Sequence, residues 1–159
     1  MVRLERAGPG DAVALLKIQR QAFAALLEKY QDYDTNPAAE SLEWMQWRLD
    51  NPERDCWFIL ANGKRVGLVC TKPVENGRSI SPIGLVPEFQ GQGIGREAVI
   101  LLEAEYPNIR RWELGTILQE ATLCRFYESL GYRSLGIWRQ LKPGMDLVGY
   151  EKRMTEKGG

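Results

Sequence analysis

Three glycines in five positions stand directly before a helical pattern, in the stretch EFQGQGIGREA at residues 88–98. Glycine lets the backbone approach a ligand closely and turn its N–H groups toward one point, and the start of a helix adds a positive dipole end. Gly91, Gly93 and Gly95 therefore predict a site for a phosphate or diphosphate. The same glycines would also suit a tight strand-to-helix turn that needs only their φ angles.

Neither of two common phosphate-binding motifs matches this loop. The P-loop needs a lysine directly after its last glycine, and this stretch has no such lysine. The dinucleotide-binding fingerprint has the spacing GxGxxG and follows the first strand of a parallel βαβ unit. Here the spacing is GxGxG, and the strand before it ends a meander. The loop alone leaves a mononucleotide-binding protein open as one function.

The residues that are missing exclude several kinds of chemistry. The chain has no histidine, which excludes histidine-based triads, histidine-ligated metals and histidine general bases. Cys56, Cys70 and Cys124 lie far apart and form no CxxC pair. We therefore expect buried thiols in a reducing compartment, with no metal site and no disulfide framework.

Charge and hydropathy bear on partners and location. The chain has 21 basic and 21 acidic residues, so its formal net charge is zero and neither nucleic acid nor an anionic membrane is the expected partner. The N-terminal stretch MVRLERAGPGDA lacks the apolar run of a signal peptide, and no run of about 18 apolar residues could span a membrane. A cytoplasmic protein is expected.

The length of 159 residues and the absence of linkers or repeats predict one domain over residues 1–159, of class α+β. Periodicity and turn signals predict the element order β-α-α-β-β-β-α-β-α-β-β. The expected elements are a strand at 2–6, a helix to about 29, a helix ending at 51, strands at 56–60, 65–70 and 79–86, a helix to about 106, a strand at 111–117, a helix ending at Gly131, and strands at 133–141 and 145–154.

Local signals place several boundaries. Pro9 suits the first position of a helix, and either Asn36 before Pro37 or Ser41 would cap the second helix. Asn51 before Pro52 would end that helix. Asn62-Gly63 favours a tight primed turn between two strands of a hairpin.

Two segments carry a resemblance to a known family. VPEFQGQGIGREA resembles motif A of the Gcn5-related N-acetyltransferase (GNAT) family, V-x-P-x-[FY]-[RQ]-x-x-G-x-[GA], with Leu85 in place of the first valine. RFYESLGYRSLG, residues 125–136, resembles its motif B. The resemblance covers nearly the full chain, is strongest over 80–136, and is to small bacterial members. It implies a mixed, mostly antiparallel sheet with a splayed strand pair and helices on both faces.

The resemblance also implies acetyl-CoA as co-substrate. In the family, the glycine loop holds the diphosphate, which assigns this role to Gln90, Gly91, Gln92, Gly93, Ile94, Gly95 and Arg96. The splayed strand pairs its backbone with the pantetheine amides, as an added peptide does, which assigns Ile83, Gly84 and Leu85. An N–H near Leu85 would then stabilise the developing oxyanion. Alternatively ISPIGLV is an ordinary central strand, although Pro82 disfavours an uninterrupted ladder.

Two side chains are the candidate catalytic groups. Tyr127 matches the motif B tyrosine and would protonate the departing thiolate, since a phenol is a suitable acid at neutral pH. It also belongs to an apolar helical stripe, so a purely structural aromatic is the alternative. Glu113 would accept the proton of the amine through a water, or is a solvated strand residue. The family's usual base position holds Gly115, and its motif B asparagine is replaced by Glu120.

The acceptor is expected to bind beside the segment EKYQDYDTNPAAE, residues 28–40. Tyr30 and Tyr33 offer aromatic surface there and the acidic residues offer negative charge, which would suit a cationic amine. A solvated loop is the alternative. Trp138 and the loop after it would close the other side.

These inferences together predict an N-acetyltransferase that moves an acetyl group directly from acetyl-CoA to the primary amine of a small molecule or peptide. The alternative is a non-catalytic acyl-CoA-binding sensor or interaction module on the same fold. A homodimer is one assembly that the sequence leaves open.

Overall fold

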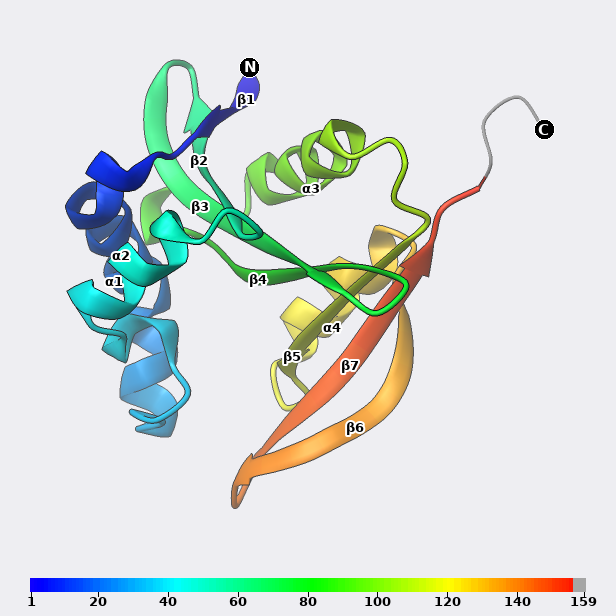
Figure 1. Ribbon diagram of the computed structural model, residues 1–159. Coiled ribbons are helices and arrows are strands. Elements are labelled where there is room, and N and C mark those ends of the chain that lie inside the picture. The colour runs from blue at the N-terminus through cyan, green and yellow to red at the C-terminus, as the bar shows by residue number, and fades with distance from the viewer. Residues whose placement is uncertain (156–159) are drawn as a thin grey trace.

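The computed structural model describes residues 1–155, which form one seven-stranded sheet with four α-helices around it (Figure 1). The strand order is β1-β2-β3-β4-β5-β7-β6, and every neighbouring pair is antiparallel except β4 and β5. The strands are β1 Val2–Arg6, β2 Asp55–Ala61, β3 Lys64–Val74, β4 Gly77–Leu85, β5 Arg111–Ile117, β6 Arg133–Lys142 and β7 Met145–Arg153. The helices are α1 Ala12–Tyr30, α2 Leu42–Asp50, α3 Ile94–Glu105 and α4 Ala121–Ser129. The expected mixed, mostly antiparallel α+β architecture is confirmed.

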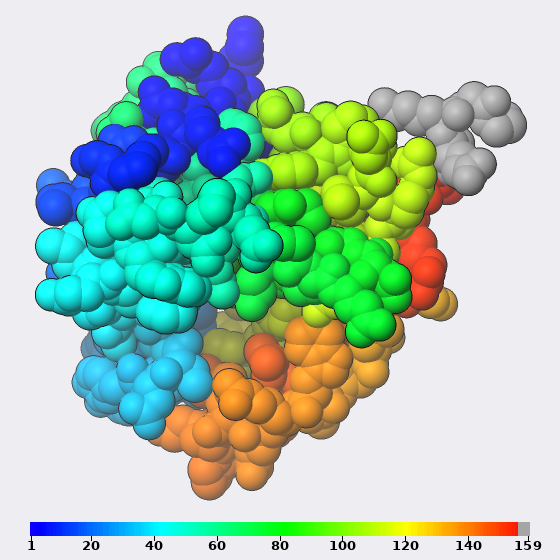
Figure 2. All heavy atoms as spheres, viewed as in Figure 1, coloured from blue at the N-terminus to red at the C-terminus, as the bar shows by residue number. Residues whose placement is uncertain are grey.

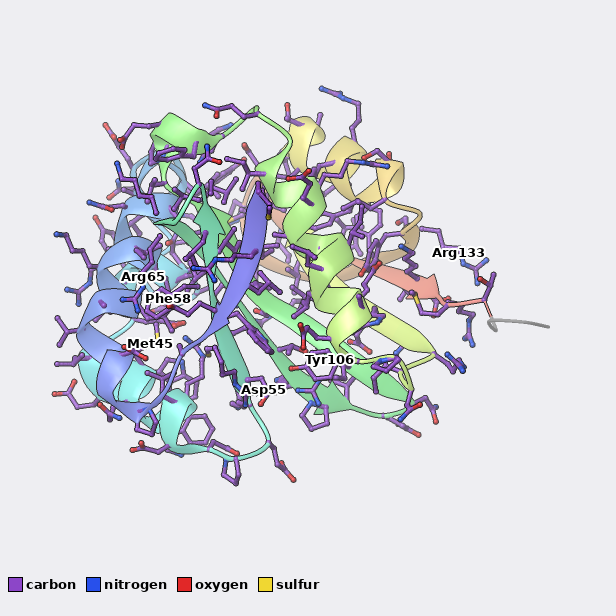
Figure 3. The ribbon with its side chains drawn as sticks, turned by 90° about the horizontal axis from the view of Figure 1, so that it is seen from above. Met45, Asp55, Phe58, Arg65, Tyr106 and Arg133 are labelled. Atoms are coloured by element: carbon purple, nitrogen blue, oxygen red, sulfur yellow. The ribbon has the colours of Figure 1, made fainter. Side chains whose placement is uncertain are left out.

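The sheet carries a hydrophobic core on each face, because side chains of a strand alternate between its two sides. In β2, Phe58 and Leu60 pack with α1 and α2, whereas Trp57 and Ile59 pack with the core of α3 and α4. Figure 3 shows Met45 of α2 and Phe58 close together on the first of these sides. The continuous apolar run of β2 is therefore that of a strand buried on both faces.

The two halves of the sheet meet at a splayed pair of parallel strands. β4 pairs with β5 only at Arg78–Trp112 and Ser79–Glu113, whereas β5 pairs with β7 along its whole length. Beyond Ser79 the two strands diverge and leave a wedge between them, which we call the wedge between β4 and β5 (Figure 1). The expected splay is confirmed.

Pro82 lies in the diverging part of β4. The β3–β4 register shifts between Val69 and Thr71, opposite Ser81 and Pro82, so the ladder with β3 is interrupted there. This agrees with the expectation that proline, which lacks an N–H donor, breaks an even ladder.

Turn and cap residues act locally as the sequence predicts. Asn62 and Gly63 both have positive φ angles, of 52° and 81°, and close the β2–β3 hairpin. Both candidate caps of the second helix are used: Asn36 accepts a bond from the N–H of Ala38 at the start of a short 3-10 turn, and Ser41 caps α2.

One hairpin extends further than expected. β3 continues to Val74 and β4 begins at Gly77, so only two residues form the turn, with Asn76 at a φ of 62°. The end of this hairpin protrudes past the core, and Pro73 on it is exposed. Apolar periodicity marks only the buried part of a strand, and the strand predicted from the sequence therefore ended at residue 70.

Polar contacts fix α3 against both halves of the sheet. The Tyr106 hydroxyl at its C-terminal end donates to Asp55 at the start of β2, and Figure 3 shows these two side chains pointing toward one another. Glu103 accepts bonds from the Tyr132 hydroxyl, at 2.9 Å, and from the Lys152 ammonium, at 3.0 Å. These contacts fix the C-terminal part of α3. Its N-terminal end, which follows the glycine loop, thereby lies at the open end of the wedge. None of the helices among residues 1–155 is long and apolar enough to cross a membrane.

Candidate acyl-CoA and amine site

The glycine loop adopts a conformation that only some residues tolerate. Gly91 and Gly93 have φ angles of 75° and 82°, and Gly93 is the N-cap of α3. A β-carbon added to either would meet no atom within 4 Å, so the space above them is open. The backbone needs the φ angles that these glycines allow, and the space above the loop is compatible with a ligand.

The loop presents a row of unused N–H donors. Within residues 1–155, the backbone N–H groups of residues 91–96 donate to no protein acceptor, and the first helical bond of α3 is from Glu97 to Gly93. Gln90 donates its side-chain amide to the carbonyl of Leu85 at 3.0 Å, which ties the loop to the end of β4. Converging N–H donors at a helix N-terminus form a site for an anion such as a diphosphate.

Arg96 lies beside this loop but is already engaged. Its guanidinium donates to the Ser129 carbonyl at 3.2 Å, at the end of α4. Arg96 therefore joins α3 to α4 in this structure, and a bound diphosphate would have to compete for it.

Along the C-terminal part of β4, every second backbone N–H group points into the wedge. The N–H of Val86 donates to the carbonyl of Val66 on β3, at 2.9 Å. Because successive N–H groups of a strand point to opposite sides, those of Leu85 and Ile83 point into the wedge. Gly84 lies against α1, where a β-carbon would be 2.8 Å from the Phe23 ring. Of the three residues expected to align pantetheine, Ile83 and Leu85 thus present backbone donors to the wedge, whereas Gly84 packs against α1.

Tyr127 lies on α4 in an aromatic cluster beside the wedge. Its ring contacts those of Phe126, Tyr132 and Tyr150 at centroid distances of 5.0, 6.2 and 6.3 Å. Burial raises the pKa of its phenol well above the ordinary value, with a further contribution from Cys124. The hydroxyl forms no hydrogen bond within residues 1–155 and is not one of the fully buried polar atoms without a partner. Tyr127 is therefore a core aromatic whose protonated hydroxyl remains available to a ligand.

Leu85, Gly95 and Phe126 bring the loop, the wedge and α4 to one place. A β-carbon on Gly95 would lie 3.4 Å from the Phe126 ring and 3.8 Å from the Leu85 side chain. The loop donors, the Leu85 N–H and the residue next to Tyr127 thus surround the same end of the wedge.

Glu113 lies at the opposite, closed end. It pairs with Ser79 where β4 and β5 still form a ladder, and its carboxylate accepts a bond from Arg111 at 2.7 Å. The structure therefore does not bring Glu113 and Tyr127 together as neighbours. A role as base needs a water between Glu113 and the amine, as the sequence already suggested.

A second carboxylate bridges the open end. Glu120, in the position of the family's asparagine, accepts bonds from the Tyr30 hydroxyl at 2.5 Å and the Lys29 ammonium at 2.6 Å. Lys142 of the β6–β7 hairpin donates to the Tyr30 carbonyl at 2.5 Å. Burial alone would raise the pKa of Glu120, but the bonds from Lys29 and Tyr30 outweigh it and the pKa lies below its ordinary value. We call these four residues the Glu120 bridge.

The Glu120 bridge gives Tyr30 a role that sequence reasoning missed. Its phenol is committed to Glu120, and burial followed by that hydrogen bond raises its pKa. Tyr33 is exposed, and its hydroxyl donates to Gln31 at 2.9 Å. Lys29 and Glu120 are 91 residues apart in the chain, so no local pattern could have paired them.

No cluster of metal-ligating side chains exists in residues 1–155, and the three cysteines are buried free thiols. What the site offers is therefore backbone donors, a phenol and carboxylates. That set is suited to holding an acyl-CoA.

Comparison with known proteins agrees with this geometry. The model of the acetyltransferase (GNAT) family matches residues 15–132. This chain belongs to the GNAT family. The uncharacterized protein YrkN of Bacillus subtilis (strain 168) is 32% identical over 129 residues, which are 79% of this chain and 69% of that protein.

Two solved GNAT-type structures illustrate the shared fold. The ribosomal-protein-S18-alanine N-acetyltransferase of Escherichia coli has a TM-score of 0.77 at 19% identity, covering 100% of this chain and 99% of its own. The PaiA N-acetyltransferase of Thermoplasma acidophilum, solved in complex with coenzyme A, has a TM-score of 0.71 at 15% identity, covering 97% and 99%. At these identities the likeness concerns the fold, and the GNAT protein described here shares it throughout.

Proposed function

We propose that this GNAT protein is an acetyl-CoA-dependent N-acetyltransferase that transfers the acetyl group directly to a primary amine. The observation that carries the proposal is the combination of the wedge with the unused N–H groups of residues 91–96 at its open end. A strand edge receives an extended, amide-bearing arm, and a helix N-terminus receives a diphosphate. The fit covers both parts of an acyl-CoA.

When bound, acetyl-CoA supplies an acetyl thioester whose carbonyl an unprotonated amine attacks directly. The Leu85 N–H, pointing into the wedge, stabilises the negative charge that develops on the carbonyl oxygen. Tyr127 holds a proton at its hydroxyl and gives it to the sulfur as the carbon–sulfur bond breaks. Glu113 receives, through a water, the proton that the amine nitrogen loses. The products are an N-acetylated amine and the CoA thiol. Exchange with solvent then returns a proton to Tyr127 and removes one from Glu113, so atoms and charge balance over the cycle.

The proton acceptor has a second candidate, because Glu120 is a carboxylate at the open end of the wedge. Its bonds to Tyr30 and Lys29 favour a role in holding that end together. Glu113 is half-buried and bonded to a single arginine, which leaves it more of its acceptor capacity.

The experiment has two arms. Calorimetry with acetyl-CoA, CoA and ATP measures which ligand the chain binds, and CoA release over a panel of amines measures transfer. We expect binding of both CoA species and release with at least one amine. Tight acetyl-CoA binding without release from any amine would instead support the acyl-CoA sensor. Binding of ATP alone would refute both and favour a nucleotide-binding protein.

A further inference from the structure

The face of the sheet that carries α1 and α2 continues over β5, β7 and β6, where no helix among residues 1–155 covers it. Leu114 and Val148 belong to the core under α3 and α4, so Gly115 and Gly149, one residue further along, point to the opposite face. Figure 2 shows a hollow on this side, between the segment around α2, the β3–β4 hairpin and the β6–β7 hairpin, with β5 deep inside it. An amine approaching the wedge from this side would pass through the hollow.

Trp138 forms part of the floor of that hollow. A β-carbon on Gly149 would lie 2.0 Å from the indole, and one on Gly115 would lie 3.2 Å from it. The ring therefore reaches from the edge strand β6 across β7 to β5. It fits because Gly149 beneath it has no side chain, and at Gly115 a β-carbon would meet the Leu147 side chain first, at 2.9 Å. The side chain remains 43% exposed, so its other face is open to a ligand. An open indole face in a hollow attracts a cation.

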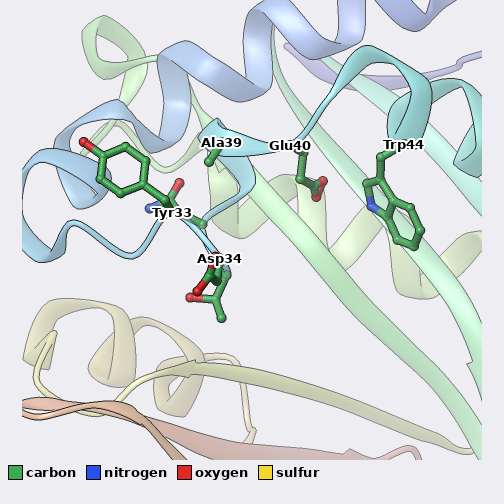
Figure 4. A pocket seen from close by; sticks show the side chains of 7 residues that line it. Tyr33, Asp34, Ala39, Glu40 and Trp44 are labelled. Carbon is green, nitrogen blue, oxygen red and sulfur yellow. The ribbon is translucent and has the colours of Figure 1, made fainter.

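A pocket in the opposing segment has complementary character. It has a volume of about 330 Å³ and lies along the connection between α1 and α2, where no lysine or arginine is among the residues that line it. Figure 4 shows Asp34, Glu40 and Trp44 directed to one side of this connection, with the Tyr33 ring turned away. The pocket thus combines two carboxylates with a second indole.

The two carboxylates differ in how they are held. Glu40 accepts bonds from buried Arg48 at 2.8 and 2.9 Å and from Gln19 at 3.1 Å, which fixes its position and offsets its charge. Asp34 is exposed and has no ion-pair partner among residues 1–155. The pocket therefore keeps one uncompensated negative charge, beside a carboxylate that is rigidly oriented.

We propose that the amine acceptor is a small aliphatic diamine or polyamine, bound at two points. Its reacting amine lies over the Trp138 indole beside the wedge, and its second ammonium lies in the pocket against Asp34 and Trp44. This inference rests on the proposed function and specifies its substrate class. Trp138 sets the position of the reacting end, and Asp34 supplies the discrimination against an amine with one charge.

The test compares 1,4-diaminobutane with n-butylamine, which has the same chain and one charge fewer. We expect kcat/KM for the diamine to exceed that for the monoamine by about 5- to 30-fold, the range of one partly desolvated charge contact. Asp34→Asn should lower this ratio by roughly 3- to 5-fold, mainly by lowering kcat/KM for the diamine. Glu43→Gln, an equal loss of charge at an exposed position of α2 outside the pocket, should leave the ratio as it is.

Trp138 is tested by two different changes. Trp138→Leu removes the ring, and Gly149→Ala puts a methyl group into the space that the ring occupies. Both should raise KM for both amines by about 2- to 30-fold, with thermal melting showing whether Gly149→Ala remains folded. An unchanged KM in folded Trp138→Leu, or an equal kcat/KM for the two amines in the wild type, would overturn the proposal.

The two-point amine site and the proposed acetyltransferase activity can be refuted independently. If no amine releases CoA, the acetyltransferase proposal fails, and calorimetry of 1,4-diaminobutane with the CoA-loaded protein still decides the inference. Binding that Asp34→Asn weakens and Glu43→Gln does not would support the two-point site. Absence of binding would overturn it.

Discussion

Tyr127 provides the most direct test of catalysis, because its ring and its hydroxyl have separable roles. Tyr127→Phe keeps the ring among Phe126, Tyr132 and Tyr150 and removes only the oxygen. That oxygen has no hydrogen-bond partner within residues 1–155, so its loss leaves no donor or acceptor unsatisfied. We expect the free energy of unfolding to change by less than about 1 kcal/mol, which for a chain of this size moves Tm by less than about 4 °C.

The kinetic effect should be much larger. Loss of a general acid costs about 100-fold in kcat, equivalent to about 2.7 kcal/mol of transition-state stabilisation. Ground-state affinity for acetyl-CoA, measured by calorimetry, should change little, since the proton is needed only as the thiolate leaves. Because burial holds the pKa of Tyr127 above its ordinary value, the phenol stays protonated throughout the neutral range. Tyr127 should therefore cause no fall in kcat between pH 7 and pH 9.

Tyr132→Phe is the matched control. Its hydroxyl donates to Glu103 at 2.9 Å, so this variant loses a bond to a charged group worth about 1.5–3 kcal/mol and its Tm should fall by roughly 3–12 °C. Its kcat should remain close to that of the wild type. Full activity of Tyr127→Phe, or an equal loss of kcat in both variants, would show that the cluster matters only as packing.

Three further changes test other parts of the site. Gly93→Val forces a branched residue to a φ of 82°, at a cost of about 1–2 kcal/mol, and fills the open space at the loop. Calorimetry should therefore show loss of CoA binding. An unchanged affinity in a folded variant would eliminate the loop as the diphosphate site. Glu113→Gln should lower kcat by about 10²-fold while Glu120→Gln should mainly lower Tm; steady-state kinetics giving the reverse order would make Glu120 the base. The stability that Glu120 adds depends on pH: its folded-state pKa is lowered, so the stabilisation is present above the ordinary glutamate value of about 4.3 and is lost as the pH falls through the folded value. Urea unfolding of the wild type and Glu120→Gln should therefore differ at pH 7 and converge in acid.

Element order and turns could be predicted because their causes are local. The apolar run of β2, the Asn62-Gly63 turn and the caps at Asn36 and Ser41 each depend on residues close together in the chain. The loop conformation at Gly93 followed in the same way, since its φ angle restricts which residue can occupy it.

The arrangement of side chains in the site depends on contacts between distant segments. Glu120 meets Lys29 and Tyr30 only once α1 and α4 are placed on the sheet. Arg111 reaches Glu151 only because β5 pairs with β7, which places Glu113 opposite Glu151. Gly115 did carry a usable signal, because a glycine inside a strand often marks a close approach of another group. The groups close to Gly115 are the Leu147 side chain and the Trp138 indole, on strands that the sequence could not place beside it.

The divergence of β4 from β5 gives the protein two strand edges in its own interior. Past Ser79, the backbone groups of β4 that point away from β3 have no strand partner, and neither do those of β5 that point away from β7. Open edges are templates on which a foreign extended chain can add, and a protein usually shields them. With acyl-CoA bound as proposed above, a pantetheine arm in the wedge would stand in for the missing strand. The resistance of these two edges to amide exchange and to pairing with another chain would then rise when acyl-CoA binds.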